Sequence, residues 1–579
     1  MYAGHVDLVD LPTKGQIHIN KNGYVYWCMK GKWDNIKKQT TDNRTIIGKI
    51  CPDDRTKFYP NNKYINVLNE IKKLNDTSNN DDENKKTSID LNDKYFMKDL
   101  HFPGAFDTEL IFGPYMAINE ACNKIGCIRA LKKAFPDYWL QIFALSMHAV
   151  VSGNSIGQDF SYWSFHNYCG ISKQIYSGQV STIYKNISEN KDSIDEFIKL
   201  FKNEYWKVFN KSEELVFAFD STNFNTASNN IDYAEYGHAK DDKNFKIVNT
   251  AIFVDEITGI PLYYEDFYGS ILDKAETPIT IEKITNLGFQ KIFLMMDRGY
   301  FSQEVIDSLK EYLFGISCPS SLDFVKKLIN DTGILIKDNE NVYIPEHNIY
   351  GNHKKKQKIC NGEFDTYLFY DPIRAEEEKS SIHQRISNYE EKISKRKKYS
   401  DKLREKYYPW IEIEKTASKK NGKDFVFKRN NEIIQEYIGN AGFFVVISNS
   451  GYNVKKMISI VRKRDVCEKS FRRIKSHFDQ ATLYCHNTKT YNGKMFVTFI
   501  ALIMVEAYRW YVKSELNALS SNTTAKTLNE LGKYIIKQKE DMTWMPKYAM
   551  TKTQKALFKC LDLDESQVIE EIRALELRV

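Results

Sequence analysis

Three acids that lie far apart in the chain are the residues best suited to chemistry. Asp220 and Asp297 each end an apolar run that is typical of a buried strand, and Glu468 lies on a predicted helix. Three cations share the face of that helix with the acid: Arg464, Arg472 and Lys475. Hard divalent cations prefer carboxylate oxygens, and Arg and Lys bind phosphate. The pattern therefore predicts a site that holds divalent metal against a phosphate group.

The helix predicted over 463–478 must present its acid beside the core. At about 100° per residue, four apolar side chains form one buried stripe: Cys467, Phe471, Ile474 and Phe478. Glu468 and its cations fall directly beside this stripe, at the border between core and solvent. The alternative is an ordinary surface helix, in which Glu468 and Arg472 form a local ion pair four residues apart.

The two aspartates are expected at the carboxyl edge of a sheet, where ligand sites of open α/β sheets gather. A buried carboxylate without a partner is costly, and a metal ion is a natural partner. The competing interpretation is that each aspartate caps the following turn. At Asp297, Arg298 and Gly299 argue against a simple cap, because the glycine would relieve a tight exit and the arginine would hold the acid or a phosphate.

Size and charge limit the class of protein. At 579 residues the chain needs three or four folded units. The net charge of +7 is modest, but Lys and Arg crowd the C-terminal part, which favours a polyanionic partner over a small neutral substrate; the alternative is a merely solvated basic surface. The ten cysteines lack zinc-site spacing, and no segment reads as a signal peptide or membrane span. We therefore expect a cytoplasmic protein with no membrane partner.

Changes of periodicity divide the chain into expected units. Strand signals around an Asn-Gly turn come first, a polar stretch follows, and helical periodicity then gives way to strands alternating with a helix. The fold class is α/β with a mixed sheet. The expected units are an N-terminal β module at 1–74, a disordered linker at 75–93, a helical domain at 94–210 that binds DNA or only packs on the core, a core at 211–318 and 441–510, a mostly helical insertion at 319–440 and a helical C-terminal region at 511–579.

The insertion carries its own packing signal and a group of aromatic residues. Its charged helix has apolar residues spaced four, three and four apart, which predicts a seam for a helical hairpin or short coiled coil: Ile382, Ile386, Tyr389 and Ile393. Tyr408 and Trp410 follow that helix. The basic run 395–398 either contacts DNA backbone or is a solvated helix face.

These segments resemble the three signatures of DDE transposases. The matching motifs are Asp220-Ser-Thr-Asn, Asp297-Arg-Gly-Tyr-Phe-Ser and Arg464-x-x-x-Glu468, with Lys475 seven residues after the glutamate. More narrowly, the chain resembles the bacterial insertion-sequence superfamily numbered four, in the branch with a long helical insertion. Further matching segments are Trp33-Asp34 with 47–49, then 268–273 and 491–502. Two positions depart from the usual pattern: Val461 replaces a tyrosine, and Ser221-Thr222 replaces a Thr-Thr pair.

The resemblance implies a ribonuclease-H-like core in which Asp220, Asp297 and Glu468 are the catalytic residues and hold two magnesium or manganese ions. It implies that four cations bind DNA: Arg464, Arg472, Lys475 and Arg298. The implied partners are transposon terminal inverted repeats and target DNA, bound by a homodimer when two ends are synapsed near the nucleoid. Trp410 or Tyr408 would stack on a flipped base, as in related enzymes that cut through a DNA hairpin; the alternative is that both aromatics only close the insertion onto the core.

Two functions follow as hypotheses. The first is an active cut-and-paste transposase, which cleaves transposon ends with metal and then transfers the strand. The second is a catalytically silent, domesticated DNA-binding protein descended from such an enzyme. The presence of all three acids argues against the second. A degradative nuclease on the same core would explain the acids but not the insertion and the additional helical domains.

Overall fold

The computed structural model describes residues 9–12, 16–19, 24–28, 32–34, 39–41, 45–51, 56–60, 109–155, 157–171, 175–209, 215–240, 244–290, 292–420, 422–518, 523–539 and 543–575. The chain divides into two units, Met1–His101 and Phe102–Val579. The linker expected at 75–93 and the Asn-Gly turn at 22–23 lie outside the described residues. Within the described part, no helix has the length and apolarity that a membrane crossing requires.

The first unit contains the strands predicted near the start of the chain. Its antiparallel sheet has the order β1-β7-β6-β3-β2, formed by Val9–Asp10, Lys57–Pro60, Thr45–Ile50, Tyr24–Cys28 and Gln16–Ile19. The predicted hairpin is confirmed, because Ile17 lies opposite Trp27. A separate ribbon pairs β4 (Lys32–Asp34) with β5 (Gln39–Thr41). Val25, Trp27, Ile47 and Phe58 form the small core.

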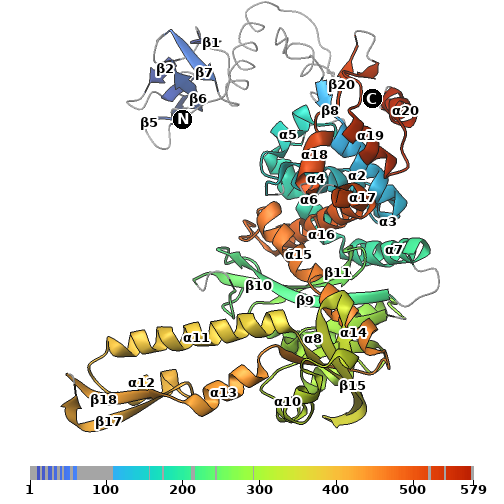
Figure 1. Cartoon of the computed structure of the whole chain (residues 1–579). Helices are drawn as coiled ribbons and strands as arrows, with labels where there is room; N and C mark the ends of the chain where they lie inside the picture. Colours follow the sequence, from blue (N-terminus) through green and yellow to red (C-terminus); the bar gives the residue numbers. More distant parts are fainter. Residues whose placement is uncertain are drawn as a thin grey trace, which may run out of the picture. The chain divides into compact units, whose positions relative to one another are not determined.

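Helices dominate the next segment, as the periodicity predicts. They are α2 (Gly113–Lys124), α3 (Cys127–Ala134), α4 (Trp139–Ser152), α5 (Phe160–His166), α6 (Ser177–Glu189) and α7 (Lys191–Phe209). The almost fully buried α16 (Thr488–Tyr511), whose segment was expected in the core, packs against α2, α4 and α6 and also against β11 (Pro261–Tyr268) of the central sheet (Figure 1). Long apolar runs such as this one do not reveal which neighbours will cover them.

The C-terminal region is joined to this helical body and is not purely helical. It contains α17 (Lys513–Ala518), α18 (Thr524–Leu531), α19 (Lys552–Lys559), α20 (Glu565–Ala574) and two strands, β20 (Ile535–Gln538) and β21 (Trp544–Pro546). These strands extend β8 (Glu109–Ile111) into a three-stranded sheet. The short strands were missed because each has too few residues to show a periodicity.

A nine-stranded mixed sheet forms the centre of the second unit. Its order is β11-β10-β9-β12-β13-β19-β16-β15-β14. The first five strands are β11 (Pro261–Tyr268), β10 (Lys246–Asp255), β9 (Leu215–Thr226), β12 (Ile292–Met296) and β13 (Leu313–Cys318). The other four are β19 (Phe443–Ser448), β16 (Gly362–Tyr370), β15 (Ile349–Ile359) and β14 (Tyr343–Ile344).

The first five strands confirm the expected ribonuclease-H-like core. β9, β10 and β11 form antiparallel pairs; residues 227–245 connect β9 to β10 and a short turn connects β10 to β11, and β12 and β13 then add parallel to β9. The parallel strands are reached through α8 (Asp273–Asn286) and α9 (Gln303–Ser308), as parallel pairing requires a crossover. Near-complete burial of β12 explains its continuous apolar sequence, whereas the equally buried β10 contains Asn249 and Thr250, which both form hydrogen bonds.

Two predicted bounds differ from the structure. β9 continues beyond Phe219 to Thr226, so Asp220 lies inside the strand rather than at its end. The polar second half of β9 has no apolar signal, yet it pairs with β10 and with the segment around Ala481. The helix predicted at 279–287 begins earlier, at Asp273, because Pro278 is accommodated inside α8.

The segment expected as an insertion at 319–440 also contributes to the sheet. β14, β15 and β16 extend the core sheet beyond β19. The part that leaves the sheet is α11 (Pro372–Ser394), α12 (Asp401–Tyr407), the ribbon β17 (Ile411–Lys420) and β18 (Lys423–Arg429), and α13 (Asn431–Asn440) (Figure 1). α10 (Asp323–Ile336) packs on the added strands. The sheet strands were missed because β15 is rich in lysine and mostly exposed along its second half.

The apolar stripe predicted on α11 is buried, but it packs on α12, the ribbon β17–β18 and α13 rather than forming a helical hairpin or coiled coil. Ile382, Ile386 and Ile393 are buried and Tyr389 is partly buried in a cluster of their own. The cluster also contains Tyr407, Trp410, Ile411, Ile413, Phe425 and Ile434. The arm formed by α11 to α13 therefore has a core separate from that of the sheet.

The helix predicted over 463–478 is a helix with two irregularities. α14 (Val454–Lys463) ends at Arg464, α15 (Val466–Arg472) follows, and Arg473–His477 form a π-helical turn. The amide of Phe478 donates to the Arg473 carbonyl at 2.9 Å, which is the wide hydrogen bond of such a turn. The predicted stripe is nevertheless buried: Cys467, Phe471, Ile474 and Phe478.

A buried ion pair anchors the π-helical turn. The Arg473 guanidinium pairs with the Glu506 carboxylate, which is 1% exposed on α16. The second oxygen of Glu506 lies 2.6 Å from Nε of Arg509. Burial, and secondly Arg509, lowers the pKa of Arg473 to about 10. The turn is therefore fixed to the helical body as well as to the sheet.

Candidate active site

Asp220 and Asp297 are brought together by neighbouring parallel strands, β9 and β12. The Ser221 amide donates to Oδ1 of Asp220 at 2.8 Å. Burial raises the pKa of Asp220, and the nearby Asp297 carboxylate adds to this shift. The Ser221 amide and two cations, Lys240 and Arg464, act against it. The two acids are thus close enough to repel each other, and a divalent cation would relieve that repulsion.

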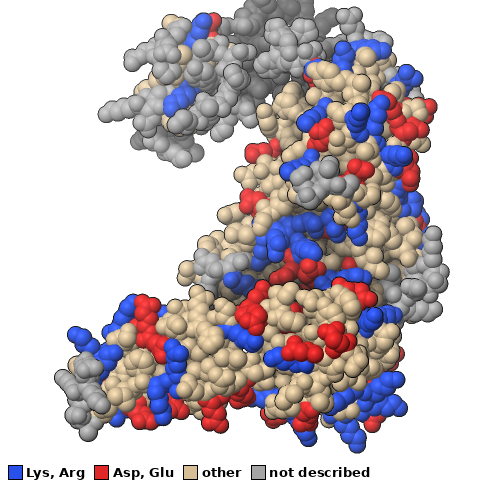
Figure 2. Space-filling view, in the orientation of Figure 1, with Lys and Arg blue, Asp and Glu red and all other residues tan. Residues whose placement is uncertain are grey.

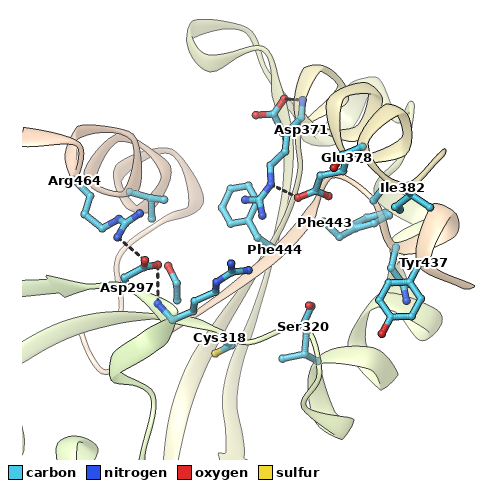
Figure 3. A pocket seen from close by; sticks show the side chains of 18 of the residues that line it. Asp297, Cys318, Ser320, Asp371, Glu378, Ile382, Tyr437, Phe443, Phe444 and Arg464 are labelled. Atoms are coloured by element: carbon cyan, nitrogen blue, oxygen red, sulfur yellow. Dashed lines mark hydrogen bonds and ion pairs between the residues drawn. The ribbon is translucent and has the colours of Figure 1, made fainter. Parts of the chain in front are cut away.

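Asp297 follows β12 directly and is held on both carboxylate oxygens. Oδ1 accepts from the Arg298 amide at 2.7 Å, so Asp297 caps the 3-10 turn η1 (Arg298–Tyr300). Oδ2 lies 3.2 Å from Nη1 of Arg464 (Figure 3). The prediction that Asp297 is not a simple cap is therefore wrong. Gly299 has open space around it and does not relieve a tight exit, and the guanidinium that holds the acid belongs to Arg464 rather than to Arg298.

The helix that carries Glu468 lies against the same strands. α15 packs on β9 and β10, and the buried Cys467 is close to Asp220. Burial, and secondly the Asp220 carboxylate, raises the pKa of the Cys467 thiol. Glu468 itself is exposed and forms no ion pair with Arg472 in the described part of the chain. Among described residues, no three acidic, histidine or cysteine side chains lie close enough to hold a metal together.

The side chains present at the site can be compared with the ligands that a divalent metal prefers. Asp220 and Asp297 supply hard carboxylate oxygens from adjacent strands, one mostly buried and one 41% exposed. This is the chemistry that magnesium and manganese prefer. The two aspartates fit such an ion, and a third carboxylate is available one residue after Cys467, although the described side chains do not yet converge on one point.

The four predicted DNA-binding cations have different surroundings. Arg464 is held by Asp297, whereas Arg298 and Arg472 are exposed. The amino group of Lys475 lies 5.7 Å from the centre of the Phe224 ring, because the π-helical turn directs it toward β9. In the space-filling view, Lys and Arg gather where α15 meets the sheet, with acidic side chains beside them (Figure 2).

The sequence pattern that singled out Asp297 also occurs at Asp371. Asp371 ends the apolar run of β16 just as Asp297 ends that of β12. β16 runs parallel to β12, since β19 is antiparallel to both β13 and β16, so the two acids lie at the same sheet edge. Asp371 binds Arg462 at 2.5 Å, two residues before Arg464. Lys240, which acts on Asp220, lies in an irregular segment and gave no signal.

A cavity of about 600 Å³ opens between this sheet edge and the root of the α11–α13 arm. Figure 3 shows Asp297 and Arg464 at one side, Glu378, Ile382 and Tyr437 at the other, and Asp371 beside them. Five arginines line the cavity: Arg298, Arg374, Arg385, Arg462 and Arg464. Three of these arginines are paired with acids that line the same cavity: Arg374 with Glu378, Arg462 with Asp371 and Arg464 with Asp297. Arg298 and Arg385 form no ion pair within the described part, so these two are the cations open to an anionic occupant.

The two candidate stacking residues differ sharply. Trp410 lines the cavity but is only 8% exposed, since its ring packs 4.4 Å from Tyr437 and the Arg385 guanidinium lies over it. Tyr408 is 66% exposed and does not line the cavity. Trp410 thus packs within the arm's own cluster rather than closing the arm onto the core of the sheet, and its stacking role stays a prediction.

Comparison with known proteins gives one family match. A family model described as "Transposase DDE domain" matches residues 211–504, just over half of the chain. No curated protein matches the sequence. A similar solved structure is described as a cryo-EM structure of a piggyBac transposase synaptic complex with hairpin DNA; it is 7% identical, covers 79% of this chain and 85% of that chain, and has a TM-score of 0.34. A score this low does not by itself establish a common fold.

Proposed function

The chain belongs to the family of transposases with a DDE domain, and we propose that it mobilises an insertion sequence by a cut-and-paste reaction. It would bind the terminal inverted repeats of the element, cleave the strands there and join the freed ends to target DNA. The observation that supports this most is that Asp220, within β9, is close to Asp297 at the end of the neighbouring strand β12, where Arg464 pairs with Asp297. Two ends must be held together, so we propose that a homodimer forms on DNA.

We assign catalysis and metal binding to Asp220, Asp297 and Glu468. Two magnesium or manganese ions, when bound, would activate the attacking water or 3′ hydroxyl and stabilise the leaving oxygen. Asp220 and Asp297 would hold the ions from neighbouring strands. Glu468 would complete the set from α15, which packs on β9 and β10; the glutamate follows Cys467, whose thiol pKa is raised by burial and secondly by the Asp220 carboxylate. The exposed side chain of Glu468 would have to turn toward the sheet to join the two aspartates.

The cations would position the DNA. Arg298 and Arg472 are exposed and near the acids in sequence, so they suit contacts with backbone phosphates. Arg464 would keep Asp297 oriented and face the scissile phosphate with the remaining donors of its guanidinium. Lys475 would supply a point charge beside β9.

The cavity suits a DNA strand that passes from the acids toward the arm. We propose Trp410 as a wall of this passage, with base stacking as its finer role, and Tyr408 as an exposed alternative for stacking. The tight packing of Trp410 against Tyr437 means that a base would reach only the edge of its ring unless the arm moves.

A second candidate is a silent DNA-binding descendant of a transposase. The exposed Glu468, which makes no ion pair within the described part, is the observation that favours it. Under this candidate the arginine-lined cavity and the exposed cations would bind DNA without cleaving it. The presence of three acids in family order favours the active enzyme.

The test is cleavage of duplex DNA taken from the boundary of the element. The wild-type chain should nick it at the repeat boundary with magnesium and not with EDTA. Asp220→Asn, Asp297→Asn and Glu468→Gln should each abolish nicking while duplex binding stays within about twofold. Undiminished nicking in any one of the three would remove that residue from the site. Binding without any wild-type nicking would favour the silent protein.

A further inference from the structure

Three consecutive cations fix the junction between α14 and α15. Arg462 binds Asp371 at 2.5 Å, Lys463 binds Glu256 at 3.2 Å, and Arg464 binds Asp297 at 3.2 Å. The three acids come from three different places: the end of β16, the turn after β10 and the end of β12. The junction is therefore attached on three sides, directly before the helix that carries the glutamate.

The attachment through Asp371 reaches the root of the arm. Asp371 is 4% exposed and caps α11, because its carboxylate accepts from the amides of Ile373 and Arg374. Its own amide donates to the carbonyl of Gly442, and the amide of Gly442 donates to Glu378 at 2.8 Å. The chain leaves the sheet at Asp371 and returns at Gly442, so Arg462 binds at the place where the two ends of the arm lie side by side.

The ion pair is not what holds α14 on the sheet. Met457, Ile458 and Ile460 are buried against residues of the second core cluster, including Phe293 and Val446. That apolar contact persists without Arg462, whose side chain is 42% exposed. The ion pair therefore acts on the orientation of the C-terminal end of α14, which the apolar contacts alone do not determine.

We propose that Arg462 and Asp371 are positioning residues for strand cleavage. Their ion pair sets the junction of α14 and α15 relative to the root of the arm, so that Arg464 meets Asp297 and Glu468 faces the sheet. Asp371 and Asp297 lie at the same edge, and Arg462 and Arg464 are two residues apart, so a shift at one pair moves the other. This inference rests on the proposed function of the acids.

The experiment uses the full-length chain with a boundary duplex. The variants are Arg462→Ala, Arg462→Lys, Asp371→Asn and the double variant Arg462→Ala/Asp371→Asn. Asparagine caps helices as well as aspartate does, so Asp371→Asn removes the charge and keeps α11. Lys469→Ala is the matched control, because Lys469 forms an exposed ion pair with Asp465 at 2.7 Å on the same helix.

Each single variant should lower the single-turnover nicking rate by about tenfold or more and leave duplex affinity, measured with calcium, within about twofold. The double variant should be no slower than the singles, because both remove the same interaction. Arg462→Lys should recover part of the rate, and the control should nick at the wild-type rate. Raising magnesium should partly restore the single variants, which a loss of folded protein would not permit.

Three results would overturn the proposal: a wild-type rate for Arg462→Ala, losses that multiply in the double variant, or losses that follow the melting temperature alone. Asp297→Asn separates this failure from that of the proposed function. If Asp297→Asn still nicks DNA, the assignment of the acids fails. If Asp297→Asn is inactive while Arg462→Ala is wild type, only the positioning role fails.

Discussion

Replacing Glu506 by glutamine should destabilise the second unit strongly. Glu506 is 1% exposed and its carboxylate is shared by Arg473 and Arg509, which are 23% and 30% exposed. The change leaves two guanidinium groups facing each other with no anion between them, in a place where burial already lowers the pKa of both. Removing one partner of a buried ion pair costs about 3–5 kcal/mol, and the partial exposure of the arginines places this case near ~3 kcal/mol.

Urea unfolding at pH 7, followed by tryptophan fluorescence, measures this loss. Glu570→Gln, on the exposed face of α20, is the control and should lie within about 0.5 kcal/mol of wild type. The magnitude can be checked a second way, since Glu506→Asp keeps the charge and should lose less than Glu506→Gln. A loss below about 1 kcal/mol for Glu506→Gln would show that the ion pair does not anchor the π-helical turn.

Three further predictions concern pH, the arm and DNA. Burial raises the pKa of Asp266 from 3.8 to about 7, so its stabilising contribution is complete below pH 4 and is lost as pH rises through 7; Asp266→Asn should remove on the order of 4 kcal/mol of this pH dependence in unfolding measured from pH 4 to 8. Trp410→Ala should destabilise the arm by about 3–5 kcal/mol in thermal unfolding, whereas the exposed Tyr408→Ala should be neutral; equal effects would contradict the described packing. Lys475→Ala should weaken duplex binding and reduce the slope of log K against log salt by about one, and an unchanged slope would remove this residue from the DNA contacts.

The strands that carry Asp220 and Asp297 could be predicted because buried strands of parallel sheets are continuously apolar. Their order in the sheet could not, since pairing is decided by tertiary contacts. The resemblance to a known family implied a ribonuclease-H-like core, and the order of its strands comes from the structure. The same apolar rule also pointed to Asp371 at the end of β16, and it was not applied there because the preceding strand β15 is rich in lysine.

Partners of charged side chains were the least predictable feature. Local spacing suggested that Glu468 pairs with Arg472 and that Arg298 holds Asp297. The structure pairs Asp297 with Arg464, far away in the sequence, and leaves Glu468 without an ion pair among the described residues. Local spacing predicts which side chains share a face of a helix. Which acid forms an ion pair with that face depends on how the helix packs on the sheet.

The helix that carries Glu468 shows what hydrophobic periodicity cannot predict. A regular α-helix over 463–478 gives the correct buried stripe, because the apolar side chains tolerate a local change of pitch. It does not give the π-helical turn at 473–477 or the direction of Lys475. Within this turn Arg473 points inward and pairs with Glu506.

The central claim is that Glu468 joins Asp220 and Asp297 around divalent metal. Calorimetric titration of manganese into the full-length chain on an uncleavable boundary duplex tests it without relying on cleavage. Wild type should bind two ions, and Glu468→Gln should lose one of them or weaken binding by about tenfold or more, as Asp297→Asn does. Identical stoichiometry and affinity in wild type and Glu468→Gln would contradict the proposed site.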